Sequence, residues 1–215
     1  MIDSAGETLM STSTEQPRVS WQGVEMTAQE FLALPDDGIH RELVRGRVRE
    51  DREQCEGESR GSGMTVRNRF HSRIVIRVGQ VLANWMDLQP EPRGEVVGGE
   101  AGFLLKGTRE SLVGIDVAVV TSDLVASTDA EQKLYHGPPL LAVEILSPND
   151  THEDIADMVT SYLAAGSVVW VIDPDLRTIT VYRPTGEVET LSVGRELSGD
   201  TYLPGFRVAV ARLFE

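Results

Sequence analysis

From about residue 95 onward, the chain is a series of short, nearly continuous apolar segments separated by glycine and proline. Strands that are covered on both faces of a sheet have this composition, because neither side of the strand meets water. The pattern therefore favours a fold in which a sheet lies between layers of helices. The segments that we expect to form strands are 96–97, 101–105, 116–120, 140–146, 168–172 and 178–182.

Two further segments are expected to be helices, and the first repeats apolar residues at steps of three and four, as amphipathic helices do. The first covers about residues 66–88, and Pro90 ends it. The second covers about residues 152–165 and is followed by Gly166, a typical helix C-cap. An early helix, then strands with one late crossover helix, predicts an α/β (α+β) sandwich with a mixed sheet.

The first residues of the chain include fewer apolar side chains than the rest. Residues 1–20 are rich in Ser, Thr and Glu, so we expect a disordered tail followed by a single domain over residues 21–215. Thr27 and Glu30 have the spacing of a capping box, which predicts a short helix. Residues 41–49 alternate around a glycine and predict a hairpin.

The charge balance limits the function classes. The chain has 34 Asp and Glu against 20 Lys and Arg, a formal net charge of −14, which excludes a protein that coats nucleic acid through overall positive charge. Ten arginines nevertheless lie between Arg41 and Arg77. They are consistent either with a solvated surface of mixed charge or with a local groove for a phosphate backbone.

Other features of the sequence bear on the cellular compartment in which the protein works. Cys55 is the one cysteine, so no disulfide can form within the chain. We find neither the positive and apolar regions of a signal peptide nor an apolar run of about 20 residues that could span a bilayer. We expect a soluble cytoplasmic protein without a membrane partner.

Two acids lie where apolar residues are expected. Glu144 has six apolar neighbours in the segment 140–146, and Asp116 begins the apolar segment 116–120. A carboxylate in such surroundings loses hydration and tends to hold its proton unless something compensates the charge. A divalent cation shared by the two acids would do so, since Mg²⁺ and Mn²⁺ prefer oxygen ligands. A buried arginine partner, or an exposed strand end, is the alternative explanation.

The motifs around these acids occur in a recognisable order. Together they resemble the Uma2-like (DUF820) family of restriction-endonuclease-like proteins, and the resemblance runs from about Met26 to Phe214. The motifs that carry it are segments 41–46, 98–103, 114–120, 141–148, 162–166, 170–174 and 203–206.

The resemblance implies a restriction endonuclease-like core of the PD-(D/E)XK superfamily, a mixed central sheet flanked by helices. It implies that Asp116 and Glu144 bind Mg²⁺ or Mn²⁺, with the carbonyl of Ile145 as a further ligand, and that Glu42 is a third catalytic acid. It also implies a DNA substrate, and a homodimer, because cutting two strands calls for two sites.

The chain departs from the family pattern at the expected lysine. Leu146 stands two residues after Glu144, and Met158 stands where related proteins carry a lysine on the following helix. Lys106 and Lys133 are the only lysines that could replace it. Among the histidines, His152 is the best placed for proton transfer, whereas His71 and His136 read more simply as structural residues.

Three functions follow from these observations. The first is a metal-dependent endonuclease that hydrolyses phosphodiester bonds in DNA through Glu42, Asp116 and Glu144. The second is a catalytically impaired protein of the same fold that acts as a binding or interaction module, as Met158 suggests. The third is a structural protein that dimerises through an exposed sheet edge and does not need the buried acids.

Overall fold

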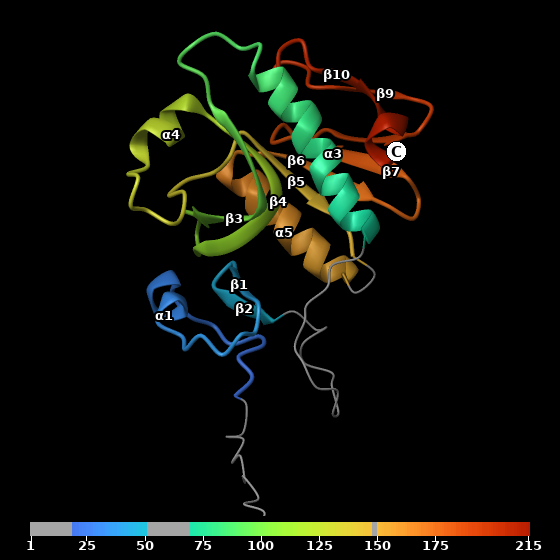
Figure 1. Ribbon diagram of the computed structural model, residues 1–215. Helices are drawn as coiled ribbons and strands as arrows, with labels where there is room; N and C mark the ends of the chain where they lie inside the picture. Colours follow the sequence, from blue (N-terminus) through green and yellow to red (C-terminus); the bar gives the residue numbers. More distant parts are fainter. Residues whose placement is uncertain (1–18, 51–68, 148–149) are drawn as a thin grey trace, which may run out of the picture.

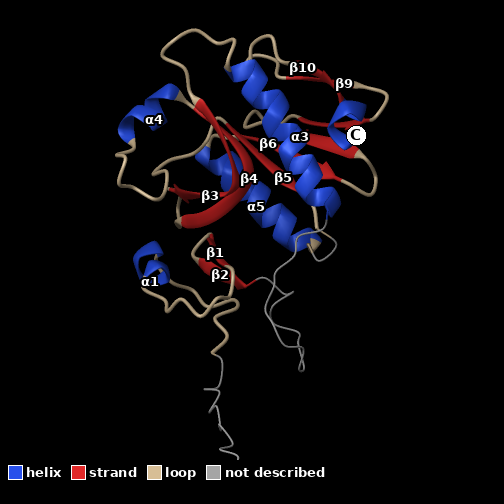
Figure 2. Ribbon diagram, viewed as in Figure 1, coloured by secondary structure: helices blue, strands red, loops and turns tan. Residues whose placement is uncertain are grey.

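A computed structural model describes residues 19–50, 69–147 and 150–215. The elements form a mixed sheet with helices on its two faces (Figures 1 and 2). The predicted fold class is therefore confirmed. The helices are α1 (Ala28–Leu32), α3 (Arg69–Met86), α4 (Ser122–Ser127), α5 (His152–Ala165) and the 3₁₀ helix η1 (Val210–Phe214).

Within the described ranges the main sheet has eight strands, in the order β2-β1-β4-β5-β6-β7-β8, with β3 also paired to β4. Its one parallel pair among the described strands is β5–β6, joined by α5, and this is the predicted late crossover. A small second sheet pairs β9 with β10. The strands are β1 (Arg41–Val44), β2 (Arg47–Glu50), β3 (Glu95–Leu105), β4 (Ser111–Val120), β5 (Leu141–Ile145), β6 (Val168–Asp173), β7 (Thr178–Tyr182), β8 (Val188–Ser192), β9 (Glu196–Ser198) and β10 (Arg207–Ala209).

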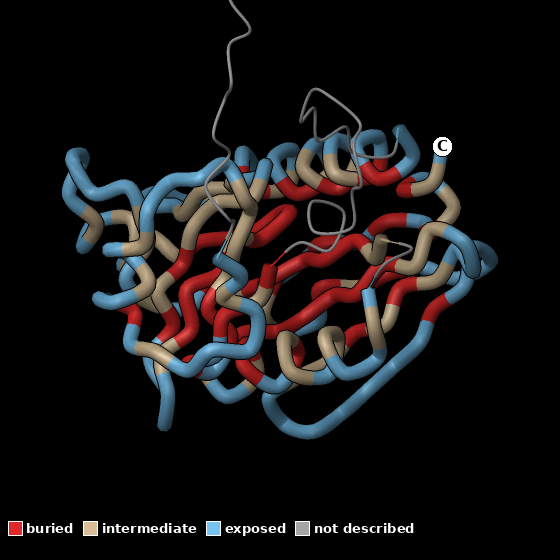
Figure 3. The backbone as a smooth tube through the Cα atoms, turned by 90° about the horizontal axis from the view of Figure 1, so that it is seen from below, coloured by how far each residue is buried: buried red, intermediate tan, exposed pale blue. Residues whose placement is uncertain are grey.

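The core has one layer on each face of the sheet. On one face, the apolar side of α3, including Ile74 and Val78, packs against β4–β7, the β9–β10 hairpin and η1. On the other face, Val159 and Tyr162 of α5 pack against β3–β6. All five residues of β5 are buried, and Figure 3 shows this buried backbone between exposed outer layers. Burial on both faces explains the nearly continuous apolar segments.

The local predictions agree with the structure in most places. The capping box of Thr27 and Glu30 opens α1, and Gly166 ends α5 in the left-handed conformation with φ of 98°. The predicted hairpin is β1–β2. Of the predicted tail, only residues 19 and 20 are described, and Cys55 lies outside the described residues. No helix in the described ranges is long and apolar enough to cross a membrane.

One predicted boundary is wrong. Segments 96–97 and 101–105 belong to a single strand, β3, whose pairing with β4 shifts register between Gly98 and Ala101. Gly99 and Glu100 both have positive φ there, at 77° and 64°. The glycines that were expected to separate two strands instead form a bulge within one.

A substitution at Gly94 can test the packing at the start of β3. A Cβ atom at this position would overlap the carbonyl oxygen of Val120, where β4 ends, whereas a Cβ on Gly79 in α3 would meet nothing within 4 Å. We expect Gly94→Ala to lower the free energy of unfolding by about 1–3 kcal/mol. Gly79→Ala, the control, should be neutral or stabilising, because alanine favours a helix. Urea denaturation followed by circular dichroism measures both, and equal effects would contradict this packing.

Candidate active site

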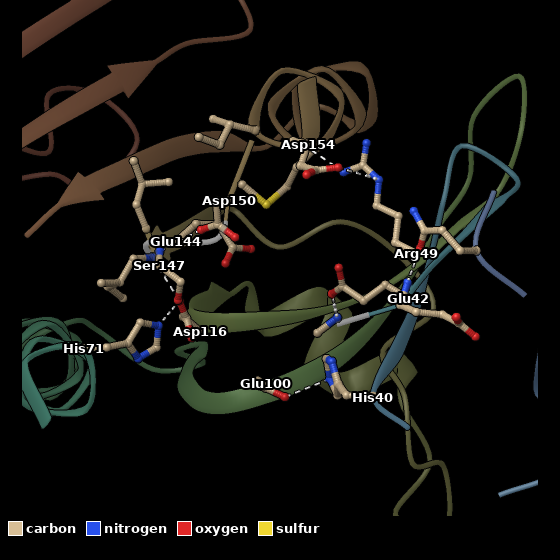
Figure 4. A pocket seen from close by; sticks show the side chains of 17 residues that line it. His40, Glu42, Arg49, His71, Glu100, Asp116, Glu144, Ser147, Asp150 and Asp154 are labelled. Atoms are coloured by element: carbon tan, nitrogen blue, oxygen red, sulfur yellow. Dashed lines mark hydrogen bonds and ion pairs between the residues drawn. The ribbon is translucent and has the colours of Figure 1, made fainter. Parts of the chain in front are cut away.

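One pocket of about 190 Å³ brings the three predicted acids together, since Glu42, Asp116 and Glu144 all line it. It lies between β1, the adjoining ends of β4 and β5, and the first turns of α3 and α5, as Figure 4 shows. Seven of its 17 lining residues are carboxylic acids, against one arginine and two histidines. The other acids are Glu50, Glu100, Asp150 and Asp154.

Asp116 and Glu144 lie on the neighbouring strands β4 and β5, just beyond the last paired residues of these two strands. The paired residues of β4 and β5 stop at Val117 and Val143, and one further step along this register sets Asp116 opposite Glu144. Beyond that point, the backbone N–H of Ile145 donates to Oδ2 of Asp116 at 2.9 Å. A carboxylate thus takes the place of a backbone acceptor, and both acids are held at the end of a buried strand pair.

Burial dominates the electrostatics of Glu144. It raises the pKa of this carboxyl well above the ordinary 4.5, and the charges of Asp116 and Glu42 raise it further. The Tyr162 hydroxyl donates to Oε1 of Glu144 at 2.6 Å and offsets part of this effect by stabilising the ionised form. Tyr162 belongs to α5 and to the core layer that this helix covers. It is buried in the core, but its hydroxyl also reaches the site.

Glu42 faces this pair from the hairpin. Its Oε1 accepts the backbone N–H of Gly114 at 2.8 Å. Burial raises the pKa of Glu42, and the Gly114 hydrogen bond and the nearby His40 lower it only in part. Burial therefore raises the pKa of two of the three acids, Glu42 and Glu144, above the ordinary value.

His71, which the sequence suggested to be structural, belongs to the site. It is buried in the first turn of α3, and its Nε2 lies 3.2 Å from Oδ2 of Asp116. One feature of the sequence could have indicated this role. His71 is a polar residue on the apolar helix face that also carries Ile74 and Val78. His152, the favoured candidate for proton transfer, is exposed at the start of α5 and does not line the pocket.

His40 and Glu100 also line the pocket and were not predicted. Nε2 of His40 lies 2.9 Å from Oε2 of Glu100. Glu100 is the residue with positive φ in the β3 bulge, a conformation that costs energy for any residue other than glycine. Bulges commonly redirect a side chain in this way, and here the redirected carboxyl faces the pocket.

Arg49 is the one arginine among the lining residues. Its guanidinium donates to the carbonyl of Asp154 at 2.9 Å and to Oδ2 of Asp157 at 2.8 Å, linking β2 to α5. Met158, at the expected lysine position, lines the same pocket. Lys106 lines a separate hollow with Thr160 and Ser161, so it does not replace the missing lysine here.

The donor chemistry fits a hard divalent cation in part. Among the described residues, no group of three or more His, Cys, Asp or Glu side chains is arranged to hold a metal ion. Asp116 and Glu144 are a two-carboxylate set, and Mg²⁺ is commonly bound by one or two carboxylates together with waters and substrate phosphates. A cation here would also relieve the repulsion that raises the pKa of Glu144.

Comparison with known proteins adds two findings. The family model "Uma2: Putative restriction endonuclease" matches residues 28–211. A crystal structure of "a putative nuclease belonging to DUF820" from Anabaena variabilis matches with a TM-score of 0.68 and 21% sequence identity, over 88% of this chain and 97% of that one. At this identity the structural match supports the fold alone. No curated protein matches the chain.

The pKa of Glu144 predicts how stability depends on pH. Above pH 4.5 the unfolded chain releases this proton while the folded protein still holds it, so stability falls as the pH rises toward the folded pKa. Glu144→Gln carries no such proton. As the pH rises above 4.5, we expect the free energy of unfolding of this variant to increase relative to that of the wild type, by about 1.4 kcal/mol per unit of pKa displacement.

Urea denaturation in EDTA at several pH values measures this difference. Glu131→Gln, which removes an exposed acid, is the control and should follow the wild type. Parallel curves for Glu144→Gln and the wild type would show that burial does not displace the pKa of Glu144.

Proposed function

The chain belongs to the Uma2 family, and from this premise we propose that its acidic pocket hydrolyses phosphodiester bonds in DNA with a divalent cation. The observation that carries the proposal is the pairing of Asp116 and Glu144 at the point where β4 and β5 separate, with Glu42 in the same pocket. Pairs of buried carboxylates destabilise a fold, and a cation-dependent reaction is a reason to retain them.

Asp116 and Glu144 would hold Mg²⁺ or Mn²⁺, and the backbone carbonyl of Ile145 would be a further ligand. When bound, such a cation lowers the pKa of water and neutralises charge on the phosphate. The Ile145 N–H and the Tyr162 hydroxyl fix the two carboxylates through one oxygen each. His71 holds Asp116 from the α3 side.

Glu42 is suited to take the proton from the attacking water. A general base works best when its pKa approaches the working pH, and burial moves the pKa of Glu42 in that direction. Arg49, at the wall of the same pocket, supplies positive charge for the phosphate. The predicted homodimer and cytoplasmic location remain predictions.

Met158 supports a second candidate function. Without a lysine at this position, one source of charge stabilisation in the transition state is missing, and Arg49 is already bound to Asp154 and Asp157. A protein of this kind could bind metal and DNA yet cleave slowly or not at all. Metal binding and cleavage are therefore tested separately.

Metal binding is measured by calorimetric titration with Mn²⁺. We expect the wild type to bind and the double variant Asp116→Asn/Glu144→Gln to lose binding, because both carboxylate ligands become neutral amides. The matched control Asp123→Asn/Glu131→Gln removes two exposed acids and should bind as the wild type does. No binding by the wild type, alone or with a phosphorothioate DNA duplex, would contradict the proposal.

Cleavage is measured in Mg²⁺ or Mn²⁺, with supercoiled plasmid and with circular single-stranded DNA as substrates. We expect slow nicking by the wild type, no nicking by Glu144→Gln, and nicking at least about tenfold faster by Met158→Lys, because an added ammonium group in the pocket stabilises developing negative charge. If Mn²⁺ binds but neither the wild type nor Met158→Lys cuts any DNA, the binding-module function replaces the endonuclease.

A further inference from the structure

A second hollow of about 570 Å³ adjoins the acidic pocket. The two share His71, Leu146 and Ser147 as wall residues, so a chain bound in one can continue into the other. Its size is in the range of sites that hold a small organic ligand. Nothing in the proposed hydrolysis, which needs only the phosphate and its neighbours, accounts for this hollow.

Aromatic rings and guanidinium groups line it. Phe70 of α3 and Phe214 of η1 contribute the rings, and Arg73 and Arg177 contribute the cations. The guanidinium carbon of Arg73 lies 5.3 Å from the centre of the Phe70 ring, and that of Arg177 lies 5.7 Å from the centre of the Phe214 ring. Phe70 is 45% exposed, so much of this large apolar side chain faces solvent.

The charge of α3 points to an anionic ligand. In a chain with a formal net charge of −14, this helix carries Arg69, Arg73 and Arg77 and no acid. None of the three forms an ion pair with an acid in the described part of the chain. Their spacing of four residues sets them along one side of the helix, beside the hollow that Arg73 lines.

Two acids also line this hollow, Asp173 and Asp175. Oδ1 of Asp173 accepts the backbone N–H groups of Asp175 and Leu176, so this carboxylate holds the turn between β6 and β7. Asp175 is exposed at the rim. A carboxylate there suits the N–H groups of a base, which donate hydrogen bonds, rather than a phosphate.

We propose that this aromatic and arginine-lined hollow binds one unpaired nucleotide of a DNA strand whose neighbouring phosphate lies in the acidic pocket. This proposal rests on the proposed function, because that function places the phosphate in the acidic pocket. Bases stack on aromatic rings and on arginine regardless of sequence, but only when they have left the base stack of a duplex. The substrate class is therefore single-stranded DNA or DNA with an unpaired stretch at the cleaved bond.

The test is binding of fluorescein-labelled dT6 and of a blunt 14-base-pair duplex, followed by fluorescence anisotropy in EDTA and again in Ca²⁺. Phe70→Leu and Arg73→Gln should each weaken binding of dT6 about 5- to 100-fold, the range typical of lost stacking. Their binding of the duplex should change less than twofold. Arg195→Gln, which removes an exposed arginine that does not line the hollow, is the matched control, and it should leave dT6 binding within about twofold.

The inference is overturned if the wild type does not bind dT6, if both variants bind it normally, or if they lose dT6 and duplex binding in equal proportion. Thermal melting checks folding, and Arg73→Gln carries the test alone if Phe70→Leu does not fold. Mn²⁺ titration of the same proteins distinguishes the two proposals. Failure of the metal site removes Mn²⁺ binding from the wild type but leaves the effects of Phe70→Leu and Arg73→Gln in EDTA, which support the hollow.

Discussion

The arrangement of the site depends on one constraint, the burial of Glu144 beside Asp116. Every residue of β5 is buried, so this carboxyl cannot keep its hydration by turning to solvent. The hydroxyl of Tyr162 compensates in part, together with a backbone hydrogen bond from Asp116. Tyr162 can donate only because α5 packs against that face of the sheet. The crossover helix thus contributes both to the core and to the chemistry of the pocket.

The central elements could be predicted because their signals are local. The apolar segments of β4–β7 and the apolar stripe of α3 are strong patterns within a few turns or strand lengths. The edge strand β8 and the small second sheet left no such signal, since four of the five residues of β8 are exposed and β9 and β10 have three residues each. The β3 bulge was missed because Gly98 and Gly99 are equally consistent with a turn.

The acids of the site could be predicted, but most of their partners could not. Glu144 and Asp116 stand out because their neighbours in sequence are apolar, and the resemblance to a family adds Glu42. His71 meets Asp116 across 45 residues of sequence, and Arg49 meets Asp154 across 105. Contacts of this range arise from the packing of α3 against β4 and from the pairing of β1 with β4, and no local pattern indicates either.

A net charge of −14 is compatible with a DNA substrate because charge acts over a limited range. At physiological ionic strength, interactions are screened beyond about 8 Å, so a bound strand responds to the groups it touches rather than to the whole protein. In the two proposals these groups are of two kinds: the acids of the pocket, which would repel a phosphate until a cation neutralises them, and Arg49 with the arginines of α3, which would attract it. Binding at the pocket and binding along α3 therefore depend differently on divalent metal, and this difference makes the two sites experimentally separable.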